Sequence, residues 1–294
     1  MGSDTSDVWE RLPTEKVRRR PLDTMSPAAL VRLLCAGERA SVRAATAAAA
    51  RIAHVAAAAG DALAAGGRLI YVGAGTSGRL AALEAAESPP TFGSDRVVAV
   101  VAGGARALRR SVEGAEDRRA DAERALRRLR AGAGDVVVGV AASGVTPFVR
   151  AALAAARAAG ARTALVTAAP GAAVGAADAI IGLAVGPEVL AGSTRLKAGT
   201  ATKIVLNALT TAAMVRAGKC YGAWMVDVRA TSAKLRARAR RIVAELAPGD
   251  PDALLRRAGG AVKTAVVMGR LGVPRARAEA LLAAAGGRLR EVIG

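Results

Sequence analysis

The sequence predicts an α/β fold in which a doubly wound parallel sheet of about five strands lies between layers of helices. Five apolar runs rich in β-branched residues alternate with long alanine-rich stretches. The runs are continuously apolar instead of alternating with polar residues, which is typical of parallel strands covered on both faces. Repetition of strand and helix at this spacing favours right-handed crossovers and therefore a three-layer αβα arrangement.

The elements are expected in a simple order along the chain. Residues 1–50 are predicted to form a helical segment, in which Ser26 and Pro27 suit a helix start as N-cap and first-turn residue. A long helix is expected over about 198–216, ended by Gly218. Between these two parts lie the expected strands, at residues 68–73, 96–102, 135–142, 162–169 and 179–185.

A domain boundary is expected near residue 247, where the stretch APGDPDAL breaks the helical pattern with two prolines and a glycine. Three short helices are expected beyond it, over residues 250–259, 261–272 and 274–287. We therefore expect an N-terminal helical segment at 1–50, a sheet domain at 51–246 and a small three-helix domain at 247–294.

The composition argues against several classes of protein. The one histidine, His54, lies in an alanine-rich helical stretch, and there are two cysteines, Cys35 and Cys220. A catalytic zinc site usually needs two or three imidazoles, and a disulfide framework needs more thiols. We therefore expect no metal site and no histidine-based catalysis.

The formal net charge of +19 raises the question of nucleic-acid binding. The basic residues are dispersed, arginine replaces nearly all lysine, and no aromatic residues interleave with them for base stacking. We expect no nucleic-acid partner. No apolar run reaches the roughly 18 residues of a membrane span, and the N-terminus has no apolar signal-peptide core, so we expect a cytoplasmic protein without membrane contact.

Three loops that follow predicted strands carry clustered glycines and hydroxyls, and each precedes an expected helix. Carboxyl ends of parallel strands meet at one edge of the sheet, and a helix N-terminus presents free N–H groups. The pattern predicts a site for a compact phosphate monoester. The positions singled out are Thr76, Ser77 and Gly78 in the first loop, Ser143, Gly144 and Thr146 in the second, and Ser193 in the third.

The sequence of these loops also fits two other interpretations. Residues 73–78 fit the dinucleotide pattern G-x-G-x-x-G, but the second strand ends in VVAGGARAL, without the acidic residue that would hold a ribose. A phosphosugar is therefore favoured over a dinucleotide. Each hydroxyl taken alone could equally cap a helix, and the convergence of three loops on one edge makes capping alone less attractive.

Longer motifs make the chain similar to a known family. YVGAGTSGRLAALEAAESPPTFG, VEGAED, PEVLAGSTRLKAGTATKIVLNALTTAAMVRAGKCYG and MVDVRATSAKL resemble the N-acetylmuramic acid 6-phosphate etherases, which have a sugar isomerase (SIS) domain and are related to the glucokinase regulatory protein. The resemblance runs from about Thr14 to the C-terminus. It implies an SIS-type fold with a small helical C-terminal domain, a homodimer and no cofactor.

The resemblance also implies a reaction. The family cleaves the D-lactyl ether of N-acetylmuramic acid 6-phosphate during cell-wall recycling, by β-elimination from the open-chain aldehyde and addition of water. Its catalytic acids map onto Glu87 and Glu116. We assign Glu87 as the acid at the lactyl oxygen and Glu116 as the base at C2, and leave the reverse division open; carboxyls can serve where their surroundings raise the pKa.

Further roles follow from the resemblance. The loop hydroxyls should hold the phosphate, with Ser193, Arg195 and Lys197 shaping the same site. Val145 stands where the family commonly has arginine, and Ala223-Trp224 stands where it commonly has Gly-Asn, which leaves the substrate preference open.

Glu87 lies nine residues beyond Gly78 on one predicted helix, which puts it roughly 14 Å from the phosphate end. A sugar phosphate is shorter than that. We therefore expect Glu87 to serve the phosphate loop of a partner subunit, with the active site near the interface.

Three rival functions remain from the sequence. A non-catalytic phosphosugar sensor is disfavoured because both Glu87 and Glu116 are present and because a duplicated sensor would need about twice the length. A phosphosugar isomerase shares proton abstraction at C2 but needs no second acid. A transcriptional regulator would need a DNA-binding domain before the sheet, and the N-terminal helical segment leaves little room for one.

Overall fold

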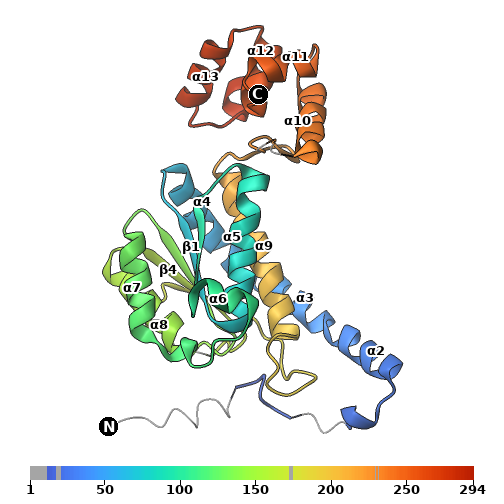
Figure 1. Ribbon diagram of the computed structural model, residues 1–294, viewed down its shortest axis with the longest axis vertical. Coiled ribbons are helices and arrows are strands. Elements are labelled where there is room, and N and C mark those ends of the chain that lie inside the picture. The colour runs from blue at the N-terminus through green and yellow to red at the C-terminus, as the bar shows by residue number, and fades with distance from the viewer. Residues whose placement is uncertain (1–11, 18–20, 172–174, 229, 231) are drawn as a thin grey trace.

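The computed structural model describes residues 12–17, 21–171, 175–228, 230 and 232–294. Within them, one parallel sheet has the strand order β2-β1-β3-β4-β5. Every strand falls inside a predicted apolar run, so the predicted fold class is confirmed (Figure 1). The strands are β1 (Leu69–Gly73), β2 (Val97–Val101), β3 (Val136–Val140), β4 (Arg162–Thr167) and β5 (Ala179–Gly182).

The order of the strands decides where a ligand can bind. The chain leaves β1 for β2 on one side and then crosses to β3 on the other, with Gly73 paired in register to both Val101 and Val140. Such a reversal opens a crevice at the carboxyl ends of the two central strands. The loops after β1 and β3 flank this crevice, and they are the first two of the predicted phosphate loops.

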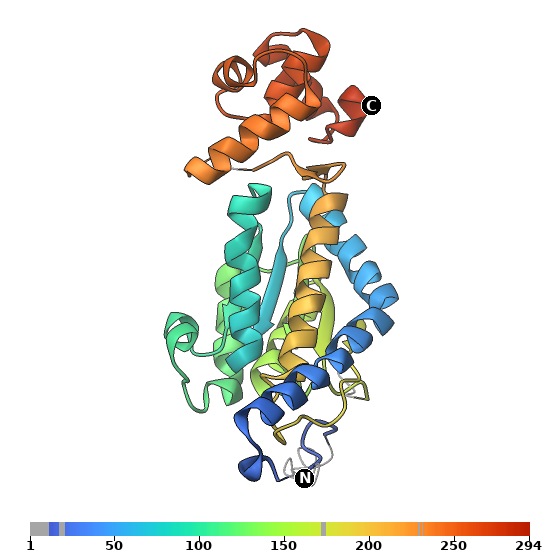
Figure 2. The same ribbon diagram turned by 90° about the vertical axis from the view of Figure 1, so that its right-hand side faces the viewer.

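Helices cover both faces of the sheet (Figures 1 and 2). One face carries α4, α5 and α9, and the other carries α7 and α8. The shorter α2 and α3 precede α4, and α6 follows β2. The bounds are α2 (Pro27–Gly37), α3 (Arg39–Ala47), α4 (Ala49–Ala64), α5 (Gly75–Phe92), α6 (Gly104–Arg109), α7 (Arg119–Leu129), α8 (Pro147–Ala158) and α9 (Lys197–Arg216).

The expected helix start at Ser26 is confirmed, because the Ser26 hydroxyl accepts a hydrogen bond from the Ala29 N–H and Pro27 occupies the first turn. The long helix expected over 198–216 is also confirmed, as α9. Residues 1–11 and 18–20 of the predicted N-terminal segment lie outside the described residues.

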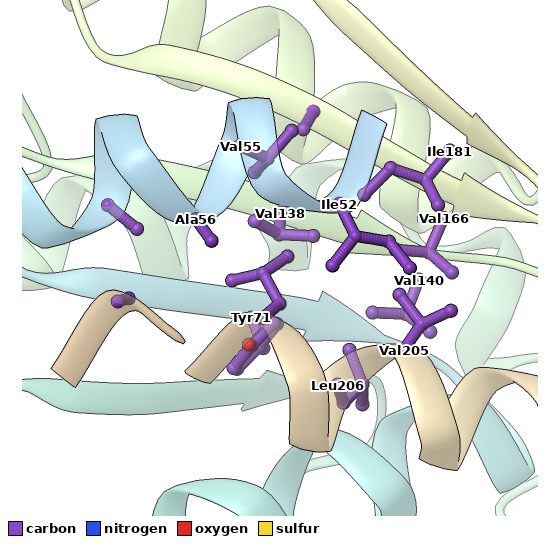
Figure 3. Packing of buried hydrophobic residues seen from close by; sticks show 14 of the residues in the cluster. Ile52, Val55, Ala56, Tyr71, Val138, Val140, Val166, Ile181, Val205 and Leu206 are labelled. Atoms are coloured by element: carbon purple, nitrogen blue, oxygen red, sulfur yellow. The ribbon is translucent and has the colours of Figure 1, made fainter. Parts of the chain in front are cut away.

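The core shows the two-residue alternation of buried strands. Tyr71 points toward α4 and α9, whereas its neighbours Ile70 and Val72 point toward the α7 and α8 side. Figure 3 shows Tyr71 among the aliphatic side chains of both helices and the central strands. The Tyr71 hydroxyl lies 2.7 Å from the Thr210 hydroxyl. Burial raises the pKa of Tyr71 far above its usual range, which favours the neutral hydroxyl.

A partly buried ion pair joins β1 and β3 at their amino ends, opposite the crevice. The Asp135 carboxyl is 6% exposed and accepts hydrogen bonds from the Arg68 guanidinium at 2.6 and 3.0 Å. The backbone N–H groups of Arg68 and Gly132 donate to the same carboxyl. Burial by itself would raise the pKa of Asp135, but these bonds and the guanidinium charge outweigh it and hold that pKa below its usual value.

Asp135→Asn is expected to lower the free energy of unfolding by about 3 kcal/mol near pH 7, because Arg68 loses its charged partner in a partly buried place. Since the folded state lowers the pKa of Asp135 below the ordinary 3.8, this contribution is present above pH 3.8 and is lost as the pH falls through the folded pKa. The difference between wild type and variant, measured by urea unfolding, should therefore hold from pH 7 to about pH 4 and shrink below it.

The exposed ion pair between Asp61 and Arg216 supplies a control, and Asp61→Asn should change stability little. A wild-type advantage over Asp135→Asn that grew on acidification would contradict the assigned role of Asp135.

The C-terminal helices form a separate apolar cluster at the end of the molecule away from α6 (Figure 1). A short hairpin of β6 (Cys220–Tyr221) and β7 (Trp224–Met225) connects them to α9. Asp227 joins the two parts, since its carboxyl lies 3.0 Å from the Lys219 ammonium and 2.8 Å from that of Lys263. The helices are α10 (Ala233–Leu246), α11 (Pro251–Arg257), α12 (Val262–Leu271), α13 (Arg275–Ala284) and α14 (Arg290–Ile293).

The three helices expected after residue 247 correspond to α11, α12 and α13. The domain boundary at 246/247 stays a prediction. The structure adds that α10, which lies before it, shares the apolar cluster of the later helices, and that this cluster extends back to Val226. We propose that α10 and the hairpin belong with the C-terminal unit. Across the described part of the chain, no helix combines the length and apolarity needed to cross a membrane.

Candidate active site

A pocket of about 330 Å³ lies at the carboxyl ends of β1 and β3. This is the crevice that the strand order creates. Among the described residues, its lining includes hydroxyls, one guanidinium and two carboxyls, together with backbone of the surrounding loops. The polar side chains are those of Thr14, Glu15, Thr76, Ser77, Arg79, Ser111, Glu116, Ser143, Thr146 and Thr194.

The loop after β1 brings Thr76 and Ser77 into the first turn of α5, which begins at Gly75. The N–H groups of a first helical turn have no partner within the helix and attract anions. The glycines of this loop serve packing. A Cβ on Gly78 would lie 2.7 Å from the Gly73 carbonyl oxygen, so both positions need glycine for α5 to approach β1.

This packing accounts for the G-x-G-x-x-G spacing without a dinucleotide. Gly78 itself is buried, and it is not among the described residues that line the pocket. Its predicted contact with the phosphate stays a prediction.

The loop after β3 supplies Ser143 and Thr146. Gly144 has a φ of +72°, which lets the chain turn sharply before α8 begins at Pro147. The Ser143 hydroxyl accepts a hydrogen bond from the Val145 N–H at 3.2 Å. Thr146 occupies the N-cap of α8, yet its hydroxyl makes no capping bond within the described chain. Capping alone therefore does not explain Thr146, whereas its position in the pocket does.

The third loop contributes less than its sequence suggested. Gly192 and Thr194 line the pocket, while Ser193 and Arg195 are not among the described lining residues. The expectation of a third open helix N-terminus needs correction. The Glu188 carboxyl accepts hydrogen bonds from Lys197 N–H at 3.1 Å and Ala198 N–H at 2.9 Å, so it already caps α9. Burial raises the pKa of Glu188, and these two N–H groups oppose the rise.

Lys197 lies away from the phosphate loops. Its ammonium is buried and donates hydrogen bonds to the carbonyls of Val185 and Pro187. It lines a second pocket, between α2, α3 and residues 184–189. The structure therefore does not bring Lys197 to the loop hydroxyls, and its predicted part in substrate binding has no support from its position.

The two predicted catalytic carboxyls are placed differently. Glu116 lies in the short 3-10 helix η2 (Ala115–Asp117), which the buried Ala115 anchors, and it lines the pocket. Glu87 lies twelve residues beyond Gly75 on α5, about 18 Å along the helix, and it is exposed. Within one chain, the structure thus joins Glu116 but not Glu87 to the loop hydroxyls.

Five polar residues of the described lining are not among the predicted site residues: Thr14, Glu15, Arg79, Ser111 and Thr194. Arg79 could have been found, because it falls in the first loop motif, one helical turn beyond Gly75. Its guanidinium Nε donates to the Ala107 carbonyl at 2.9 Å, which holds the side chain between α5 and α6. Glu15 lies in none of the loop motifs. It reaches the pocket because the neighbouring Thr14 contacts Gly192, far away in the sequence.

The arrangement suits a phosphorylated ligand beside a proton-transfer group. The N-terminal turns of α5 and α8, the four predicted hydroxyls that line the pocket and the Arg79 guanidinium can hold a phosphate dianion. Glu116 lies in the same pocket and can take or return a proton.

Comparison with known proteins identifies relatives along nearly the whole chain. Residues 47–157 match the family described as glucokinase regulatory protein N-terminal SIS domain. The N-acetylmuramic acid 6-phosphate etherase of Deinococcus radiodurans is 50% identical over 279 residues, covering 93% of this chain and 92% of that protein. Etherases of the same name from Trichormus variabilis and a Nostoc species are 47% and 46% identical, covering 96% and 98% of this chain and 94% and 97% of their own lengths.

Proposed function

The chain belongs to the family of N-acetylmuramic acid 6-phosphate etherases, and we propose that its pocket carries out the reaction of this carbon–oxygen lyase. The substrate is N-acetylmuramic acid 6-phosphate, and the products are N-acetylglucosamine 6-phosphate and D-lactate. The observation that carries the assignment to this pocket is the convergence of hydroxyls from two helix N-terminal turns with the Glu116 carboxyl. The proposal includes a cytoplasmic location, where a sugar phosphate of cell-wall recycling would be met.

The phosphate is held where the two central strands end. Thr76 and Ser77 donate from the first turn of α5, and Ser143 and Thr146 donate from the loop before α8. The two helix N-termini offer the phosphate only a partial positive charge, and the Arg79 guanidinium adds a full one. Val145, which replaces the arginine common in the family, lies two residues after Ser143 in the same loop, and we propose that the Arg79 guanidinium supplies the missing positive charge.

The chemical steps follow from the aldehyde form of the sugar. Glu116 takes the proton from C2, which the neighbouring carbonyl acidifies, and the electron pair forms the double bond between C2 and C3. The C3–O bond breaks, and the lactyl oxygen takes a proton from Glu87 as D-lactate leaves. Water then adds with its oxygen at C3 and a proton at C2, so the same two carboxyls act in reverse and no cofactor is consumed.

Glu87 reaches this chemistry from a second copy of the chain. Leu83 and Glu87 share one exposed face of α5, because they lie four residues apart. Leu83 is 44% exposed, and Val215 on the neighbouring α9 is 50% exposed. Exposed apolar side chains beside a catalytic carboxyl fit a self-complementary interface. We propose a homodimer in which Glu87 of each chain enters the pocket of the other.

Purified protein incubated with N-acetylmuramic acid 6-phosphate is expected to release D-lactate and N-acetylglucosamine 6-phosphate in equal amounts. In water labelled with ¹⁸O the heavy oxygen should enter the sugar at C3 and not the lactate, because the C3–O bond is the one that breaks. Mass spectrometry of both products checks this outcome.

The rivals predict other outcomes of the same incubation. A sensor would raise the melting temperature with the sugar phosphate and release no lactate. An isomerase would exchange the C2 proton without cleaving the ether. Either result would overturn the proposed reaction while leaving the phosphosugar pocket in place.

A further inference from the structure

The pocket that Glu116 lines contains a second carboxyl of the same chain, that of Glu15. Glu15 lies before α2, in a segment that the buried side chains of Leu12 and Thr14 anchor at 7% and 2% exposure. The Glu15 N–H donates to the Leu12 carbonyl, and the Gly192 N–H donates to the Thr14 carbonyl, each at 3.0 Å. The segment is therefore tied to the third loop at the pocket.

The backbone at Gly192 lies close to this carboxyl. Its φ of +72° lies in the left-handed region that favours glycine. A Cβ at this position would also meet Glu15 Oε2 at 2.5 Å. The backbone of the third loop thus leaves room for the Glu15 carboxyl, which a side chain at position 192 would push aside.

The chemistry of the pocket decides what Glu15 can bind. A carboxylate repels a phosphate dianion, so Glu15 does not belong with the hydroxyls and Arg79 that suit the phosphate. An ionised carboxyl only accepts hydrogen bonds, so its partner must be a donor. The sugar of the proposed substrate offers such donors in its hydroxyls and its amide N–H.

We propose that Glu15 is a specificity-determining residue, whose carboxyl accepts a hydrogen bond from a hydroxyl or amide N–H of the sugar and so orients C2 toward Glu116. This inference rests on the proposed function, because it places the sugar of that substrate in the pocket. It assigns to the N-terminal segment a direct part in recognising the ligand, and it gives the third loop its role as the support of Glu15.

Glu15→Gln is expected to raise KM for N-acetylmuramic acid 6-phosphate by about 10- to 100-fold, the size of a lost hydrogen bond to a charged group. The value of kcat should change much less. Inhibition by inorganic phosphate should be retained, because phosphate alone does not reach Glu15. Gly192→Ala, which pushes the carboxyl aside, should raise KM in the same way.

Asp23→Asn is the matched control, since Asp23 is an exposed carboxyl of the same N-terminal region outside the pocket, and it should leave KM unchanged. Circular dichroism and melting temperature show that each variant is folded. A loss of kcat with KM unchanged would mean that Glu15 does chemistry. An unchanged KM and kcat would mean that Glu15 has no role in binding or catalysis. A raised KM together with loss of phosphate inhibition would mean that Glu15 only supports the structure of the pocket. Each of these three results overturns the proposal.

Direct binding of N-acetylglucosamine 6-phosphate, measured by calorimetry, separates this proposal from the proposed reaction. If the wild type binds this sugar phosphate but releases no lactate from the substrate, the reaction is wrong. Weaker binding by Glu15→Gln, with inorganic phosphate still bound, would even then support the role of Glu15. Equal binding by wild type and variant would contradict it.

Discussion

Mixing two inactive variants, Glu87→Gln and Glu116→Gln, is expected to restore the release of D-lactate. Each variant alone lacks one of the two carboxyls in every site. In a heterodimer, one pocket combines Glu116 of the first chain with Glu87 of the second and is complete, while the other pocket lacks both. Random exchange makes half of the dimers mixed, so about a quarter of all sites should become active.

The structure gives this expectation its physical basis. Glu87 lies about 18 Å along α5 from the first turn of that helix, and it is exposed outside the pocket that Glu116 lines. A phosphosugar cannot bridge this separation within one chain. Restoration after mild unfolding and refolding of the mixture, followed by a lactate assay, would show that the two carboxyls come from different chains.

The matched control mixes Glu87→Gln with the double variant that carries both substitutions. Heterodimers form equally well in that mixture, but neither of their pockets has Glu87 and Glu116 together, so no activity should return. If native mass spectrometry finds the heterodimer in the first mixture and lactate release is still absent, the shared site is contradicted. Sedimentation of the wild type as a monomer would contradict the homodimer itself.

Glu116→Gln alone is expected to lower kcat by about a thousandfold, because loss of a positioned base typically costs 10²- to 10⁴-fold. KM should change by only a few-fold, since the phosphate contacts come from other residues. The isosteric amide keeps the shape of η2, whose anchor is the buried Ala115. Steady-state kinetics of lactate release measures both constants.

Proton exchange in deuterated water assigns the two carboxyls individually. Exchange at C2 of N-acetylglucosamine 6-phosphate needs the base but no leaving group. Glu116→Gln should therefore abolish the exchange, whereas Glu87→Gln should retain it. The reverse result would interchange the roles of acid and base. Asp117→Asn, a neighbouring exposed carboxyl that does not line the pocket, should leave both reactions unchanged.

Much of the fold was predictable because local patterns and sheet topology suffice for it. Strand β1 (Leu69–Gly73), for example, has no charged residue, and like β3 it is buried along its whole length. The hydroxyls after β1 and β3 meet because carboxyl ends of parallel strands lie at one edge of a sheet. The sequence therefore determined the class of fold, the edge that holds the site, and the two loops that line it with Thr76, Ser77, Ser143 and Thr146.

Only the tertiary structure decided which nearby groups reach the pocket. Glu188 caps α9, Lys197 is turned to the carbonyls of Val185 and Pro187, and Glu15 enters through the contact of Thr14 with Gly192. The direction of a side chain and the contact of segments far apart in the chain depend on packing, which no local pattern encodes. The sequence by itself thus determined the sheet edge at which the pocket lies, and packing decided which carboxyls and cations line that pocket.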